Sequence, residues 1–345
     1  MPVSTDNKLC VRCVLPENFP GVRFNGEGVC NHCQQAPSAE AVRENVARLH
    51  GEMVSAIEAN KGGRDYDCIV AYSGGKDSSY TLKALSENYG LKCLAVTVDN
   101  GFMSEQARVN SKAVTAALGV DYQLFTPAWS FMSGMYKQSV TNTELHTKAA
   151  IKRASAICNS CIGLINVYMI RLALMHGAKL IAGGYIGGQV PKDTAILELN
   201  LDLYMKTREA TIGRYEESFG EDTRKYFDVP EGLLKSAQMK KITILNPMLA
   251  LNVGEEEIIA QLAPLGWKPT LDTGVNSSNC RLNDFGIAMH YNTHGFNPYV
   301  FEISEQVRHG LMTREVALKK ALSIPSLEEV QWQAKKLGVQ IECAE

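Results

Sequence analysis

The sequence predicts an α/β protein built on a doubly wound parallel sheet, with a small N-terminal four-cysteine module and a mainly helical C-terminal region. Three observations predict this architecture. Short apolar runs alternate with helical patterns between residues 66 and 182. Residues 1–35 are rich in Gly, Pro, Asn and Cys, and after about residue 190 the alternation gives way to helical patterns. We therefore divide the chain into residues 1–37, a linker helix at 38–65, an α/β domain at 66–200 and a mainly helical region at 201–345.

Composition narrows the class of protein further. The 345 residues are 45% hydrophobic and 21% charged, which excludes a wholly disordered chain. No apolar run approaches the roughly 18 residues of a membrane span, and residues 1–10 do not resemble a secretory signal. The net charge of −2 argues against tRNA or DNA as the main partner. Ten cysteines without a signal sequence indicate metal or catalytic use in a reducing, cytoplasmic compartment.

The linker helix and the α/β domain follow from local patterns. Ser38 is a typical N-cap, and apolar residues then recur at spacings of three and four up to Ile57. Apolar runs predict strands, and amphipathic segments between them predict helices. The expected strands are 66–72, 92–98, 121–125 and 179–182, and the expected helices are 79–89, 105–118 and 162–176.

The pattern of the C-terminal region predicts several helices and one long loop. Residues 200–240 look mostly helical, and further helices are expected at 255–262, 313–322 and 326–337. Residues 268–300 are rich in Asn, Gly, Thr and Ser and predict a functional loop. His290 and His294 lie four residues apart in this segment. We interpret them as polar loop residues or substrate contacts rather than as metal ligands.

Four cysteines near the N-terminus have the spacing of a metal site. Cys10-x-x-Cys13 is followed, after sixteen residues, by Cys30-x-x-Cys33. Two such pairs are typical of a zinc ribbon, in which four thiolates hold Zn²⁺ in a tetrahedral site. Because all four ligands come from the protein, we expect this zinc to be structural.

A glycine-rich turn, residues 73–78, follows the first expected strand. Its residues are Ser73, Gly74, Gly75, Lys76, Asp77 and Ser78. Backbone amides at a helix N-terminus bind phosphate, Lys76 can neutralise its charge, and Asp77 could hold Mg²⁺. Asp99, at the end of the second strand, could meet the nucleotide or the metal. The plainer alternative is a tight turn built of small residues.

The segment from Tyr72 to Ser79, with the sequence YSGGKDSS, resembles the signature of the PP-loop ATP pyrophosphatases. The resemblance implies a HUP-like α/β fold in which residues 66–200 bind ATP and the turn grips its pyrophosphate. It also implies that ATP transfers AMP to a carbonyl-type oxygen, and that a nitrogen or sulfur nucleophile then displaces AMP. Adenine would lie near residues 96–99. On this basis we take Lys76 and Asp77 as catalytic residues.

Three further cysteines could form a second site. Cys158 and Cys161 form a C-x-x-C pair just before the expected helix 162–176, and Cys280 lies far downstream. Three thiolates can hold a 4Fe–4S cluster with one iron open to sulfide, and a helix N-terminus would lower their pKa. The layout resembles the iron–sulfur PP-loop tRNA thiolases. A redox pair with an unrelated Cys280, zinc, and no shared site at all are the alternatives.

Much of the chain also resembles the N-acetyl sugar amidotransferases, which convert an acetamido group to an acetamidino group. The segments that carry this resemblance are CVRCVLPE at 10–17, PGVRF at 20–24, GVCNHC at 28–33, SGGKDSSY at 73–80, GWK at 266–268 and GLMTRE at 310–315. Residues 182–189, AGGYIGGQ, depart from that family's Trp-Gly-Glu-Asn-like element, so the substrate side is expected to differ. The nitrogen reaction would require a glutaminase partner, because no glutaminase domain is evident.

We therefore expect an ATP-dependent, AMP- and PPi-forming enzyme that replaces an oxygen of a small molecule with sulfur. Cys158, Cys161 and Cys280 would carry the cluster, and residues 201–345 would complete the cluster and substrate site. The acceptor could be a nucleobase, a nucleotide or a sugar, and the sulfur donor a cysteine desulfurase. A sugar amidotransferase and a tRNA thiolase are the alternatives, and a homodimer is left open.

Overall fold

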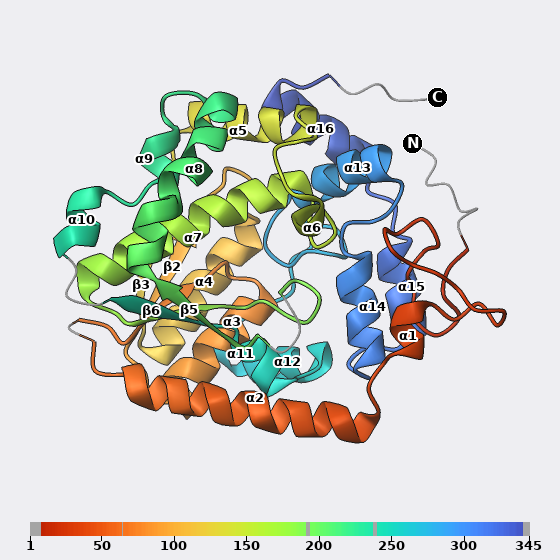
Figure 1. The fold of residues 1–345 in the computed structure, drawn as a ribbon, viewed down its shortest axis with the longest axis horizontal. Coiled ribbons are helices and arrows are strands. Elements are labelled where there is room, and N and C mark those ends of the chain that lie inside the picture. Colours follow the sequence, from red (N-terminus) through yellow and green to blue (C-terminus); the bar gives the residue numbers. More distant parts are fainter. Residues whose placement is uncertain (1–7, 64, 191–193, 237–239, 341–345) are drawn as a thin grey trace.

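The computed structural model describes residues 8–63, 65–190, 194–236 and 240–340. Its centre is a sheet flanked by helices (Figure 1). The sheet has six strands in the order β3-β2-β1-β4-β6-β5. All neighbouring strands run parallel except the edge strand β5, which is antiparallel to β6. The strands are β1 (Cys68–Ala71), β2 (Cys93–Val98), β3 (Asp121–Phe125), β4 (Leu180–Gly183), β5 (Ile196–Asn200) and β6 (Lys241–Leu245).

The topology confirms the predicted α/β fold with a mostly parallel sheet. The chain runs outward from β1 to β2 and β3, and then returns to place β4 on the other side of β1. The strand order therefore reverses between β1 and β4, where Ala71 pairs with Gly183 in register. In open α/β sheets, ligands bind in the crevice at the carboxyl ends of the strands where the order reverses.

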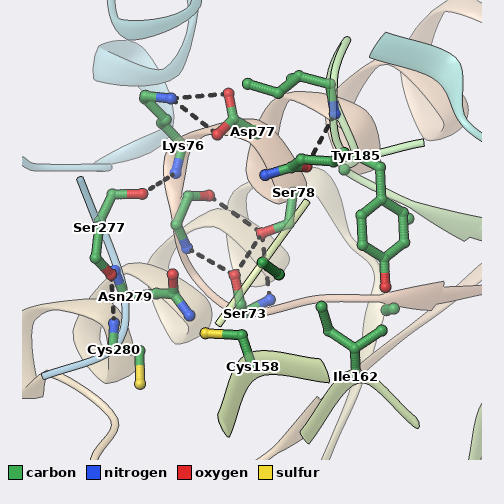
Figure 2. Close-up of a pocket in the computed structure, with 18 of the residues that line it drawn as sticks. Ser73, Lys76, Asp77, Ser78, Cys158, Ile162, Tyr185, Ser277, Asn279 and Cys280 are labelled. Atoms are coloured by element: carbon green, nitrogen blue, oxygen red, sulfur yellow. Dashed lines mark hydrogen bonds and ion pairs between the residues drawn. The ribbon is translucent and has the colours of Figure 1, made fainter. Parts of the chain in front are cut away.

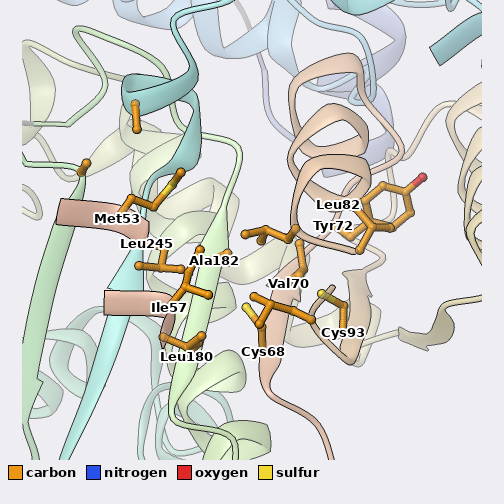
Figure 3. Close-up of a cluster of buried hydrophobic side chains, with 14 of the residues drawn as sticks. Met53, Ile57, Cys68, Val70, Tyr72, Leu82, Cys93, Leu180, Ala182 and Leu245 are labelled. Atoms are coloured by element: carbon orange, nitrogen blue, oxygen red, sulfur yellow. The ribbon is translucent and has the colours of Figure 1, made fainter. Parts of the chain in front are cut away.

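Alternate residues of the strands pack against different helical layers, because successive side chains point to opposite faces. Cys68 and Val70 of β1 share one core with Met53 and Ile57 of α2 (Figure 3). Ile69, between them, packs in the core beneath α7 on the other face. The helices on the first face are α2 (Ala39–Asn60), α3 (Lys76–Lys83) and α11 (Pro247–Leu251), and those on the second are α7 (Ala156–His176), α8 (Leu201–Phe219) and α10 (Glu231–Ser236).

The linker helix forms as its pattern predicts. Ser38 caps α2 by accepting a hydrogen bond from the Ala41 amide at 3.1 Å. Leu49, Met53 and Ile57 form the buried stripe of this helix. Shorter helices connect and flank the sheet. They are α1 (Asn31–Gln34), α4 (Glu105–Leu118), α5 (Trp129–Thr141), α6 (Lys148–Ile151), α9 (Thr223–Phe227) and α12 (Glu255–Leu262), with a π-helical turn (Ala84–Asn88) after α3 and a 3₁₀ turn (Ala263–Leu265) after α12.

The C-terminal region is helical, as expected, but the predicted long loop at 268–300 is wrong in its second half. The structure has a helix, α13 (Asn283–His294), in that segment. The polar and small residues of α13 mask its periodicity, although seven of its residues are buried. Three helices follow: α14 (Val300–Arg308), α15 (Arg314–Ala321) and α16 (Leu327–Leu337).

Helix α7 begins six residues before the expected helix 162–176. Ser155 caps it by accepting a hydrogen bond from the Cys158 amide at 3.2 Å, so Cys158 and Cys161 lie inside its first two turns. Strands β5 and β6 and helix α5 are also absent from the sequence prediction. The β-branched run of β6, KITIL, is a strand signal that the sequence analysis did not use.

Helix α7 is also long and apolar enough to cross a membrane by length and composition, with a mean hydropathy of 1.6 over its most apolar window. Half of that window is buried inside the protein, where α7 packs on β1 and β4. The burial is that of a core helix in a folded domain.

The N-terminal module packs on the C-terminal helices. Phe19 contacts both Phe296 and Phe301, with ring centroids 5.0 Å and 5.5 Å apart. The Arg314 guanidinium donates hydrogen bonds to the backbone oxygens of Cys13 and Cys10 at 3.0 Å and 3.2 Å. In Figure 1 this module lies beside α14 and α15. Apolar residues of the module and of these helices form one buried cluster.

Candidate active site

A cavity of about 1060 Å³ opens where the strand order reverses. The turn after β1, the turn after β4, the start of α7 and the segment before α13 all contribute to its walls. Another side is closed by Glu302 and Gln306 of helix α14 and by Tyr299, which precedes the helix. The volume suits a nucleotide together with a second small molecule.

The glycine turn, residues 73–78, forms one wall of the cavity (Figure 2). Ser78 lies in the first turn of α3, and its hydroxyl accepts a hydrogen bond from the Ser73 amide at 3.2 Å. The Lys76 amide donates to the Ser278 hydroxyl at 3.2 Å. Serine hydroxyls and the first amides of a helix thus converge here, which is the arrangement that binds phosphate. All predicted turn residues except Gly74 line the cavity.

Gly74 holds the turn against the rest of the domain. Its φ is +73°, and a Cβ there would lie 2.2 Å from the Ala107 carbonyl oxygen. The Trp267 indole Nε1 donates to the Gly74 carbonyl oxygen at 3.0 Å. The sequence analysis did not identify this contact, because its two residues lie 193 positions apart.

Charged side chains gather next to the turn. The Lys76 ammonium lies 2.8 Å from the Asp77 carboxylate and 3.8 Å from that of Glu255. Glu255 also pairs with Lys320 at 2.7 Å. Burial disfavours the Lys76 charge, but Asp77 and Glu255 outweigh it and raise the pKa of Lys76. Lys76 therefore stays a cation at neutral pH.

The glycine-rich segment at 182–189 passes so close to neighbouring backbone that two of its positions have no room for a side chain. A Cβ on Gly184 would lie 2.7 Å from the Ser78 amide, and one on Gly188 would lie 2.5 Å from the Glu302 Cα. The segment is thus a thin spacer between the start of α3 and α14. Gln189, at its end, donates to the Glu302 carboxyl at 2.9 Å.

Glu302 is a site residue that sequence reasoning did not identify. Burial, with the charge of Asp77, raises its pKa to about 7. A cavity carboxyl that gains and loses a proton near neutral pH is a candidate proton carrier. No sequence signal marks Glu302, because its position depends on how α14 packs.

The cysteines Cys158, Cys161 and Cys280, hereafter the central cysteines, all line this cavity. Cys158 and Cys161 come from α7, while Cys280 is brought in by a short bridge between its own backbone and Met103. The structure therefore brings together the three residues that the sequence separates by up to 122 positions. All three line the same cavity as the glycine turn, and Figure 2 shows Cys158 and Cys280 below that turn.

The expected lowering of these thiol pKa values by the helix N-terminus does not hold for Cys161. Burial raises the pKa of Cys161 to about 12 and that of Cys280 to about 11, and the neighbouring cysteines add to the effect. Desolvation thus outweighs the helix dipole. Both groups are thiols at neutral pH unless a cation binds them.

Asp99 does not line the cavity. One carboxylate oxygen accepts from the Gly101 amide at 3.0 Å, and the other pairs with Arg108 at 2.6 Å. Through these two contacts Asp99 stabilises the turn after β2. The rings of His290 and His294 contact each other on α13 in a tilted arrangement, with centroids 4.5 Å apart, and also lie outside the cavity.

The four N-terminal cysteines form a separate buried site. The Sγ atoms of Cys10, Cys13, Cys30 and Cys33 all lie within 4.8 Å of one another. A hydrogen bond from Cys30 lowers the pKa of Cys13 to about 4 in spite of burial, with help from the Leu15 amide and Arg308. Four buried sulfurs at this separation can hold a metal ion such as zinc.

Comparison with known proteins gives distant similarity. No family model matches the chain. An uncharacterized protein of Methanocaldococcus jannaschii, MJ1599, is 27% identical over 325 residues, which are 93% of this chain and 95% of that protein. Argininosuccinate synthase of Dictyoglomus thermophilum is 27% identical over 154 residues, which are 43% of this chain and only 38% of the synthase.

Among solved structures, the U34-tRNA thiolase NcsA from Methanococcus maripaludis, with its 4Fe–4S cluster, has a TM-score of 0.34 and 16% identity. The alignment covers 97% of this chain and 90% of the thiolase. The chain is thus similar over less than half of its length to argininosuccinate synthase, and its own strands form a mostly parallel sheet with the glycine turn before α3.

Proposed function

We propose that this protein is an ATP-dependent enzyme that adenylates an oxygen of a small molecule and then replaces that oxygen with sulfur. One observation carries the proposal: the glycine turn and the central cysteines line the same cavity at the point where the strand order reverses. In such a cavity the turn can bind the phosphates of ATP while the acceptor oxygen is activated. The nearby thiols can then take part in delivering sulfur to the activated carbon.

In the first step the acceptor oxygen attacks the α-phosphorus of ATP. The bond from that phosphorus to the oxygen bridging the α and β phosphates breaks, and pyrophosphate leaves. The amides and hydroxyls of the turn hold the β and γ phosphates, and the Lys76 ammonium offsets the charge that grows on the leaving group. Asp77 lines the cavity at the start of α3, and its carboxylate is suited to hold Mg²⁺ there.

In the second step a sulfur nucleophile attacks the activated carbon. The carbon–oxygen bond breaks, and AMP leaves with the original oxygen, so no oxidant or reductant is consumed. Glu302 lies in the same cavity and can accept the proton that the nucleophile loses.

The central cysteines fit an iron–sulfur cluster in their donor chemistry. They are three thiols that line one cavity, and cysteine sulfur is the usual ligand of an iron–sulfur cluster. A 4Fe–4S cluster held by three cysteines supplies one iron with an open position for sulfide. A cysteine desulfurase is the class of donor that would provide this sulfur.

A small molecule is the acceptor that we favour. The net charge of −2 does not suit a protein that grips a nucleic acid backbone. A nucleobase, a nucleotide and an amino sugar all fit a cavity of about 1060 Å³ beside ATP.

Product analysis with candidate acceptors tests this proposal. Purified protein is incubated anaerobically with ATP and each acceptor, once with sulfide and once with ammonium, and AMP, pyrophosphate and product mass are measured. Sulfide incorporation together with equimolar AMP and pyrophosphate is the expected result. Ammonium incorporation instead would identify the amidotransferase alternative, and stimulation only by added tRNA would identify a tRNA thiolase. ATP turnover to ADP would overturn the adenylation step itself.

A further inference from the structure

Arg153 is a cation of the cavity lining that the two proposed reaction steps do not use. Lys76 and Lys320 also line the cavity, and both pair with carboxylates, at 2.8 Å to Asp77 and at 2.7 Å to Glu255. Within the described part of the chain, no carboxylate lies within 4.0 Å of the Arg153 guanidinium. Its positive charge is therefore not neutralised by those residues.

The hydrogen bonds of Arg153 leave most of its donors open. In the described residues the guanidinium makes one such bond, a long one from Nη1 to the Gly188 carbonyl oxygen at 3.4 Å. A guanidinium carries five N–H donors in a planar fork, which matches two oxygens of one phosphate. Arg153 is half-buried, so part of its hydration is already lost. An anion bound there would restore the missing hydrogen bonds.

The turn that carries Arg153 is fixed against α7. The Asn159 Nδ2 donates to the carbonyl oxygens of Ala150 and Ala154 at 3.3 Å and 3.0 Å. The Arg153 amide donates to the Ala150 carbonyl oxygen at 2.9 Å. The backbone on both sides of Arg153 is thus tied down, five residues before Cys158 in the chain. Such support positions the guanidinium before a ligand arrives.

Gln306 approaches the same stretch of backbone from α14. Its Nε2 lies 3.7 Å from the position that a Cβ on Gly187 would take, next to the Gly188 carbonyl that Arg153 contacts. Gln306 lines the cavity, and its side chain makes no hydrogen bond to any residue that the structure describes. Arg153 and Gln306 are therefore two donors from different elements, both beside residues 187–188.

We propose that Arg153, with Gln306 as a second donor, binds a phosphate group of the acceptor, so that the acceptor is a nucleotide or a sugar phosphate. This inference rests on the proposed function. The acceptor oxygen must reach ATP at the glycine turn, and its carbon must then meet the sulfur delivered at the central cysteines. Arg153 precedes Cys158 on the way into α7 and can hold the far end of the acceptor there. Lys76 serves the phosphates of ATP, which leaves Arg153 for a second anion.

Binding of inorganic phosphate tests the inference without sulfur chemistry. The protein is first saturated with α,β-methylene-ATP, in which a CH₂ group replaces the bridging oxygen whose bond breaks in the first step, so that the glycine turn is occupied. Binding of radiolabelled phosphate to this complex is measured by equilibrium dialysis in wild type, Arg153→Gln and Lys152→Gln. Lys152 is the matched control, because it is a neighbouring half-buried cation that does not line the cavity.

Wild type is expected to bind a single phosphate, and Arg153→Gln to lose about 10- to 100-fold in affinity. Lys152→Gln should keep the wild-type affinity. Arg153→Lys retains the charge without the fork, and its expected loss of several-fold decides the matter if the glutamine variant does not fold. Absence of phosphate binding in wild type, or equal binding in wild type and the Arg153 variants, would overturn the inference. So would a loss confined to the affinity for the ATP analogue, because Arg153 would then serve ATP.

Pairs of acceptors connect the phosphate site to the reaction. A nucleoside and its 5′-monophosphate, and an amino sugar and its 6-phosphate, are compared in the product assay with sulfide. The phosphorylated member should have the higher kcat/KM, and Arg153→Gln should raise its KM without changing the KM for ATP. Turnover of the unphosphorylated members alone would overturn the inference while adenylation stands. Absence of AMP and pyrophosphate with every acceptor would instead overturn the proposed function, and phosphate binding would still show whether Arg153 holds an anion.

Discussion

The Trp267 indole donates a hydrogen bond to the carbonyl oxygen of Gly74 at 3.0 Å, across 193 positions of the sequence. This contact ties the glycine turn to the segment that follows α12. The same segment is anchored by Asn110, which donates to the Lys268 carbonyl oxygen at 2.7 Å. The geometry of the glycine turn therefore depends on residues far from it in the chain.

Trp267→Phe is expected to weaken ATP binding several-fold and to destabilise the fold by about 1–3 kcal/mol, because the buried Gly74 carbonyl loses its best partner. Thermal denaturation with and without ATP measures both effects. Trp332→Phe is the control, since Trp332 is 38% exposed and packs on Arg281 outside the cavity. Equal ATP affinity in the Trp267 variant and wild type would contradict this role of the indole.

Lys76→Met is expected to lower the rate of pyrophosphate release by about 10²–10³-fold, because the cation beside the phosphates is lost. The measurement is pyrophosphate formation at saturating ATP. Lys83→Met, on the same helix, removes a lysine that pairs with Glu87 at 2.9 Å and lies outside the cavity. We expect that control to keep the wild-type rate within about twofold.

Glu302 is expected to make stability fall as the pH rises. Its folded pKa of about 7 lies above the ordinary value of 4.5, so the folded state binds more protons than the unfolded state between these values. Its contribution is fully present below pH 4.5 and is lost as the pH rises through 7. Denaturant unfolding of wild type and Glu302→Gln from pH 4.5 to 8 checks this.

The free energy of unfolding of wild type should decrease over that range by at most about 3 kcal/mol more than that of Glu302→Gln. The difference between the two proteins isolates Glu302 from Asp284, whose pKa burial raises to about 6. Parallel pH profiles for the two proteins would show that Glu302 is charged in the folded state throughout.

Cys13→Ser is expected to abolish metal binding at the N-terminal site and to lower the melting temperature. Cys13 is fully buried among the other three sulfurs, and its backbone oxygen accepts from Arg314 on α15. Metal analysis and thermal denaturation measure the two effects. Cys93→Ala, in the sheet core, is expected to retain the metal, and metal-free wild type with an unchanged melting temperature would refute a structural role.

Asp99→Asn is expected to leave ATP affinity within about twofold of wild type while it destabilises the protein by about 1 kcal/mol, because it weakens a partly buried ion pair with Arg108. Calorimetric titration with ATP and denaturant unfolding provide the two measurements. A large loss of ATP affinity with unchanged stability would return Asp99 to the nucleotide site that the sequence suggested.

Some features of this protein are determined by sequence alone, because they depend on neighbours within a few residues. The capped helix from Ser38, the glycine turn that opens α3 and the paired cysteines of the N-terminal module all belong to this group. The alternation of strands and helices also suffices for the mostly parallel sheet, since parallel strands require crossover connections. Local propensity and spacing carry these signals.

The tertiary structure alone decided which distant residues share the cavity. Cys280 meets the start of α7 only because its segment pairs with Met103, and Glu302 faces Lys76 and Asp77 only because α14 packs on the N-terminal module. Asp99 is directed to Arg108 by contacts that no spacing rule contains. Such placements follow from the burial of apolar faces between elements far apart in the chain, which a local pattern does not encode.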